Sequence, residues 1–143
     1  MELVVQKDVL LKQLNYAVSI VEKKVGMPIL SSVRMVSEKD KFSIYASNLT
    51  VSVVSFQKVK SISPGEITVD GKKLYEIIKE LPLGEVRLST SENGELLIQS
   101  GRSTFKIHAG SGADYPALQG LVISSNTPLD PHTLKDMFGA TSF

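Results

Sequence analysis

The lysines of this chain are numerous and grouped in a way that could attract a polyanion. Residues 1–80 hold twelve Lys or Arg against nine Asp or Glu. Seven of the lysines lie in or beside two predicted helices: Lys7, Lys12, Lys23, Lys24, Lys72, Lys73 and Lys79. Two interpretations stay open. The lysines belong to solvated faces of amphipathic helices, or they form a positive surface for a polyanion.

Residues that could catalyse a reaction do not form a recognisable set. His108 and His132 have no acid-rich ligand set beside them, so each is interpreted as a surface histidine rather than a metal ligand. Glu76 and Glu80 are spaced i, i+4, but nearby lysines favour a helix surface over an acid and base pair. No nucleotide-binding P-loop is present. The sequence therefore predicts no catalytic residue, no metal and no cofactor.

One pattern, the end of a strand followed by the apolar face of a helix, occurs three times. Its apolar positions are Val5, Leu10 and Leu14; Val69, Leu74 and Ile78; and Leu129, Leu134 and Phe138. The steps of 64 and 60 residues suit a unit of one helix and several strands. The first two copies predict a doubled domain. The third predicts the opening of another domain, so we expect the chain to be part of a longer protein.

Hydrophobic periodicity and turn residues predict two helices and eight strands in the first two copies. Helices are expected at residues 7–21 and 71–80, the second ended by Leu81-Pro82. Val51 and Val53 predict a buried face on the fourth strand, and Asn93-Gly94 predicts a hairpin turn. The strands are expected at residues 2–5, 32–36, 42–46 and 50–56, and again at 66–69, 85–89, 95–99 and 104–108.

These elements predict an α+β fold, a doubled βαβββ unit with two helices packed on antiparallel sheets. The expected domain covers residues 1–122, in units of about 1–62 and 63–122. Residues 123–143 are expected to be a linker with the first strand and helix of a truncated second domain. Burial of both apolar helix stripes would leave the opposite sides of the helices as one exposed surface that carries lysines.

Composition describes an ordinary soluble protein. Apolar residues make up 42% and charged residues 22% of the 143 residues. No run of about 18 apolar residues is present, which argues against a membrane span. The N-terminus lacks the apolar core of a signal peptide. There is no cysteine, hence no disulfide framework and no thiolate zinc site, and a cytoplasmic location is expected.

Three local sequences in a fixed order are more specific than the composition. They are Met27-Pro28-Ile29-Leu30, then Ser100-Gly101-Arg102-Ser103 with Phe105, then Ala113-Asp114-Tyr115-Pro116 with Leu118. In this order, together with the doubled pattern, they make the chain resemble the N-terminal domain of the bacterial sliding clamp, the beta subunit of DNA polymerase III. The resemblance covers essentially the whole chain and includes the start of the second clamp domain.

The resemblance implies a processivity factor of the replicative DNA polymerase. Clamps of this family have three similar domains per chain, and two chains close head to tail into a ring that encircles duplex DNA without sequence specificity. The ring slides along the DNA and tethers DNA polymerase III, and a clamp loader opens it with ATP. It has no catalytic residue of its own. Polymerase and loader dock on domains that lie outside these 143 residues.

Particular residues acquire roles through the resemblance. Lys24, with its neighbour Lys23, matches a basic position that faces DNA. Phe105 and Ile107 match apolar positions on the edge strand that pairs with the partner chain. The alternative, that both are ordinary core residues, stays open. The helix lysines implied to face the hole are Lys12 on the first helix and Lys72, Lys73 and Lys79 on the second. Asn48 and Thr50 depart from the more acidic turn of the family.

Two other classes of function remain as alternatives. A stand-alone protein-binding or RNA-binding module could have the same doubled fold without catalysis. The third, incomplete copy of the pattern argues against that reading. An enzyme acting on a small molecule is disfavoured because no acid, base, nucleophile or metal set is recognisable.

Overall fold

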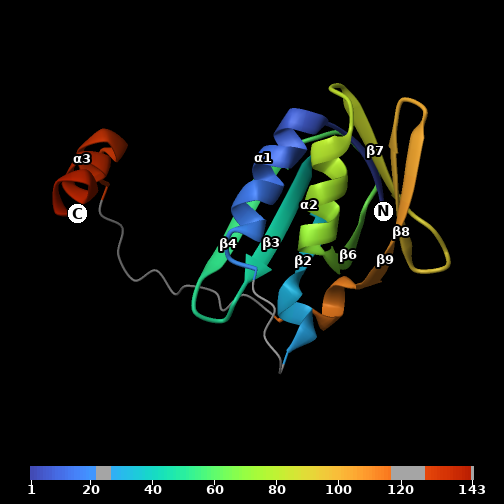
Figure 1. Cartoon of the computed structure of the whole chain (residues 1–143), viewed down its shortest axis with the longest axis horizontal. Helices are drawn as coiled ribbons and strands as arrows, with labels where there is room; N and C mark the ends of the chain where they lie inside the picture. Colours follow the sequence, from blue (N-terminus) through green and yellow to red (C-terminus); the bar gives the residue numbers. More distant parts are fainter. Residues whose placement is uncertain (22–26, 117–127, 143) are drawn as a thin grey trace.

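The computed structural model describes residues 1–21, 27–116 and 128–142 (Figure 1). Nine strands follow one another in the order β4-β3-β2-β6-β9-β8-β7-β1-β5, and every pairing is antiparallel. The strands are β1 Glu2–Gln6, β2 Ser32–Ser37, β3 Lys41–Ser47, β4 Ser52–Lys58, β5 Ser61–Ser63, β6 Gly65–Asp70, β7 Glu85–Thr90, β8 Glu95–Ser100 and β9 Ser103–Ser111. The predicted α+β fold with antiparallel sheets is confirmed.

The two units of the doubled pattern exchange their first strands. β1 pairs with β7 of the second unit, while β6, the first strand of the second unit, pairs with β2 of the first. Neither unit therefore has a complete sheet of its own. The exchange joins the two copies, because β1 and β6 each take one of their two neighbouring strands from the other unit.

β9 connects the two halves of the sheet. Residues 103–108 pair with β8, and residues 109–111 pair with β6. Ala109 is buried where the strand changes partner. The outer side of residues 103–108 has no strand partner within the described part of the chain, and the same holds for the outer side of β4.

Helices α1 (Lys7–Val18) and α2 (Gly71–Glu80) lie side by side on one face of the strands (Figure 1). Both ends of α2 agree with the sequence prediction. Asp70 accepts a hydrogen bond from the backbone N of Lys73 at 2.9 Å, which caps the helix start. α1 is three residues shorter than predicted. The Ser19 hydroxyl donates to the Tyr16 carbonyl, an alternative to continued helix, and only turns follow.

The core lies between the helix pair and the strands. Leu10, Leu14, Leu74 and Ile78 are fully buried, so the apolar positions that defined the repeat are core positions in both helices. The strands contribute inward-facing side chains, and those that are large and fully buried include Leu3, Met35, Phe42, Ile44, Leu88, Leu96 and Ile98. Burial of each such side chain contributes about 1.5–3 kcal/mol.

Three sequence predictions are wrong in part. β5 was not expected, because its three residues pair only with β1 and show no periodicity of their own. Val51 is exposed rather than buried, since it lies in the turn before β4. Residues 128–130 are not a strand, although a strand was expected to end at Leu129.

The third copy does contain its predicted helix, α3 (Pro131–Thr141). Asp130 caps this helix by accepting from the backbone N of Thr133 at 2.8 Å. Leu134 and Phe138 are exposed, whereas the matching residues of α1 and α2 are buried. Residues 128–130 have no strand partner among the described residues, and the rest of the strand predicted before α3 lies outside the described part of the chain.

Candidate nucleic-acid surface and open strand edge

The outer side of the helix pair is the first candidate surface. The start of α1 and the end of α2 lie together, because the Lys7 Nζ donates to the Lys79 carbonyl oxygen at 2.8 Å and to that of Leu81. The helices are therefore antiparallel, and Lys7 caps the carbonyl end of α2. Lys7, one of the seven lysines counted toward a positive surface, is therefore engaged within the fold.

Lys72 and Lys79 are exposed and seven residues apart, so they share the face of α2 opposite the buried Leu74 and Ile78. Glu76 lies on the same stripe and lowers its net charge. Lys12 is exposed on α1. The result is a weakly positive surface with no aromatic side chain placed for base stacking on α2's outer stripe.

Lys73 is also exposed but borders a different feature. It lines a hollow of about 680 Å³ together with Lys106, Ile107 and His108 of β9. The hollow lies where β9 separates from β6. Lys73 therefore belongs to the edge of the strand layer as much as to the helix surface. Lys23 and Lys24, the remaining lysines of the prediction, lie outside the described residues.

The open edge of β9 is the second candidate surface. Phe105 keeps 39% of its surface exposed, which rules out the ordinary core position for this residue. Ile107 is half-buried and packs against the core. Both side chains lie on one side of a strand whose outer backbone edge has no partner among the described residues. Such an edge can accept another strand.

β4 presents a comparable edge that the sequence did not reveal. Phe56 is 66% exposed, and the Lys41 Nζ lies 5.3 Å from its ring centroid. Val54 is exposed on the same side of the strand. The alternation of Val54 and Phe56 about Ser55 is the sequence signal that could have indicated this second apolar face.

A buried amide lies near that edge. Gln13 of α1 is 4% exposed, and neither polar atom of its side chain has a hydrogen-bond partner within the described residues. It lines a hollow of about 300 Å³ with Tyr16, Ser55 and Phe56. Periodicity places position 13 on the buried stripe of the amphipathic helix. It does not mark the residue as an amide without hydrogen-bond partners.

Histidine and the acidic side chains are the groups in this chain that could ligate a metal ion. His108 and His132 are exposed. Within residues 1–21, 27–116 and 128–142, no group of three or more His, Cys, Asp or Glu side chains could hold a metal ion. No helix in this described part is long and apolar enough to cross a membrane.

The exchanged strands, the adjacent helices and the open edges define the class of proteins with the sliding-clamp fold. A crystal structure of the beta sliding clamp of Caulobacter crescentus superposes with a TM-score of 0.89 at 33% identity, covering 96% of this chain and 37% of that one. A crystal structure of the DNA polymerase III subunit beta of Pseudomonas aeruginosa gives 0.78 at 32% identity over 84% of this chain and 32% of that one.

Residues 1–119 match the family model of the DNA polymerase III beta subunit, N-terminal domain, and the chain belongs to that family. The resemblance inferred from the three motifs is confirmed. The beta sliding clamp of Caulobacter vibrioides is 33% identical over 145 residues, and that of Pseudomonas aeruginosa is 32% identical over 147. Both alignments include all of this chain, which spans 39% of the length of each relative.

Proposed function

We propose that this chain is the N-terminal domain of a processivity factor of the replicative DNA polymerase. In a full-length protein, two copies assemble head to tail into a ring that encircles duplex DNA without sequence specificity. The ring slides and tethers DNA polymerase III. The observation that carries this proposal is the exposed, weakly basic surface of the paired helices in a chain of this family.

The charge on that surface suits sliding. α2 carries three lysines against two glutamates, and α1 carries Lys7 and Lys12 against Asp8. Flexible ammonium groups attract phosphate without reading bases. Strong neutralisation of many phosphates would hold the protein in one place, since each contact adds to affinity. Lys12, Lys72, Lys73 and Lys79 are the described candidates for DNA contact, and Lys23 and Lys24 remain candidates from sequence.

The open edge of β9 suits assembly. We assign Phe105 and Ile107 to the contact with the second clamp chain, because an unpaired strand edge with a partly exposed aromatic side chain is suited to strand addition. The polymerase catalytic subunit and the ATP-dependent clamp loader would act through domains outside these residues. The protein would have no catalytic residue and no cofactor, and would work in the cytoplasm.

Retention on DNA circles tests the proposal. A full-length version that carries this domain should stay on a closed DNA circle after loading and leave when the circle is cut. The control is the same DNA supplied in linear form from the start. Equal rates of loss from closed and linear DNA would contradict encirclement, whatever the affinity at low salt.

A further inference from the structure

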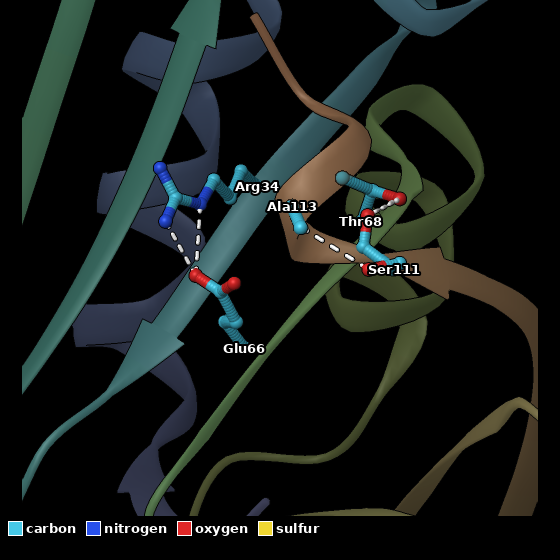
Figure 2. A network of polar contacts seen from close by, with 5 residues as sticks. All are labelled: Arg34, Glu66, Thr68, Ser111 and Ala113. Atoms are coloured by element: carbon cyan, nitrogen blue, oxygen red, sulfur yellow. Dashed lines mark hydrogen bonds and ion pairs between the residues drawn. The ribbon is translucent and has the colours of Figure 1, made fainter. Parts of the chain in front are cut away.

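Residues 111–116, called the strap here, cross the face of the strands opposite the helices. Arg34, Glu66 and Thr68 lie on this face, since their neighbours Val33, Ile67 and Val69 are in the core. Figure 2 shows the strap passing in front of the strands that carry these residues, with α1 behind. The strap contains the 3-10 turn Gly112–Asp114 and the whole of the Ala113-Asp114-Tyr115-Pro116 motif.

The beginning of the strap is held close to β6. The Thr68 hydroxyl donates to the Ser111 carbonyl oxygen at 3.3 Å, and the Ser111 hydroxyl accepts from the Ala113 backbone N at 3.2 Å (Figure 2). A Cβ atom added to Gly112 would lie 2.7 Å from the Glu66 side chain. Glycine is therefore required for the close approach.

Glu66 is itself held in place. Both Nε and Nη2 of Arg34 donate to the same Glu66 oxygen, the first at 3.2 Å (Figure 2). The Arg34 guanidinium lies 5.6 Å from the Tyr45 ring centroid. The carboxylate against which Gly112 packs is consequently positioned by charge-assisted hydrogen bonds from a neighbouring strand.

The end of the strap is held by one residue. Tyr115 is 4% exposed, and its hydroxyl accepts a hydrogen bond from the Ser47 backbone N at 2.8 Å. Ser47 is the last residue of β3 and is buried too. Ala113 and Asp114 are exposed, so Tyr115 is the buried side chain on which attachment of the strap depends.

We propose that Tyr115 is a positioning residue that latches the strap to the end of β3 and fixes where the chain leaves this domain. The Tyr115 hydroxyl reaches the backbone of Ser47, just before the turn that leads into the open edge of β4. Without the latch, the strap would be tied only near β6, about the width of two strands away. Resting on the proposed function, the latch would set where the next clamp domain begins.

Amide hydrogen exchange on the isolated chain tests the latch. Tyr115→Phe keeps the ring and removes the acceptor, which leaves the buried Ser47 N–H without a partner. We expect exchange of the Ser47 amide to accelerate about tenfold or more, while the amides of β6 and β8 keep their rates. Tyr16→Phe, the same change at an exposed tyrosine, should leave Ser47 unaffected.

Two outcomes would overturn the latch. An unchanged Ser47 amide in Tyr115→Phe would show that the hydroxyl does not hold it. Equal acceleration of every slow amide would show a merely structural role, exerted through global unfolding. Neither result depends on DNA or on ring assembly, so failure of the clamp function would not be mistaken for failure of the latch.

A distance measurement tests directly whether Tyr115 fixes the position of the strap. The chain has no cysteine, so spin labels can be placed at Asp114→Cys on the strap and Lys58→Cys on β4, both exposed. We expect Tyr115→Phe, and Gly112→Ala as a second variant, to widen the distribution of label distances. Gly139→Ala, where an added Cβ contacts nothing, is the matched control. Identical widths in all variants would overturn the proposal.

Discussion

The ammonium of Lys7 and the carbonyl oxygen of Lys79 are 2.8 Å apart, although 72 residues separate them in sequence. This contact ties the first turn of α1 to the last turn of α2. It also separates the lysines of the helix pair into two kinds. Lys7 stabilises the fold, whereas Lys12, Lys72 and Lys79 extend into solvent.

Replacing Lys7 should therefore reduce stability. Lys7→Met keeps most of the aliphatic stem but removes the cation from the carbonyl end of α2. We expect the free energy of unfolding to fall by about 1 kcal/mol, measured by urea denaturation. Lys12→Met, at an exposed position of the same helix, should change it by less than about 0.5 kcal/mol. Equal losses in the two variants would contradict the structural role of Lys7.

Charge reversal on α2 should weaken DNA contact without sequence dependence. In a full-length ring, Lys72→Glu with Lys79→Glu should lower affinity for duplex DNA at low salt. It should also make the plot of log affinity against log salt shallower by about one unit for each lost phosphate contact. Lys39→Glu, in the turn between β2 and β3, is the control of equal charge. A slope that stays at the wild-type value would remove both lysines from the DNA surface.

Replacing the buried Gln13 should stabilise the chain. Gln13→Leu replaces a buried amide that lacks partners by an apolar side chain of similar size. We expect the free energy of unfolding of this chain to rise by about 1–2 kcal/mol, because the cost of burying unsatisfied polar atoms is removed. Gln13→Ala controls for loss of the amide with a cavity left behind. A less stable Gln13→Leu variant would mean that the amide has a partner, such as an ordered water.

Phe105 should matter for assembly more than for folding. Because its side chain is partly exposed, Phe105→Ala should change the stability of this chain by less than about 1 kcal/mol. In the proposed full-length dimer, loss of an aromatic anchor should weaken association by about 2 kcal/mol, or roughly 30-fold, measured by sedimentation. Leu83→Ala, at a more exposed apolar residue, is the control. Unchanged dimerisation would move the interface away from β9.

Asp130 should make α3 sensitive to acid. The backbone and hydroxyl hydrogen bonds from Thr133 hold the pKa of the Asp130 carboxyl below its ordinary value of 3.8. A lowered pKa means that the cap stabilises the helix above about 3.8 and loses this effect as the pH falls through the folded-state pKa. Carboxyl and amide NMR shifts of Asp130 and Thr133 should report one common titration. Asp130→Asn keeps an acceptor and should remove the pH dependence; its persistence would exclude Asp130 as the cause.

Local chemistry made several elements predictable to within a residue or two. Leu81-Pro82 marked the end of α2, and Asn93-Gly94 placed the turn between β7 and β8, where Gly94 has a φ of 71°. The three motifs also led to the family and to the lysines of the helix surface. Each of these signals comes from residues close together in the chain.

The tertiary structure decided which strands pair with one another. Periodicity shows which side of a strand is apolar but not which strand lies beside it, so the exchange of β1 and β6 between units could not be foreseen. The same limit applies to the exposure of Phe105 and Phe56, to the burial of Gln13, and to Tyr115 reaching a backbone amide 68 residues away. Alternating apolar residues fix a local face, whereas exposure and hydrogen-bond partners depend on what distant segments cover.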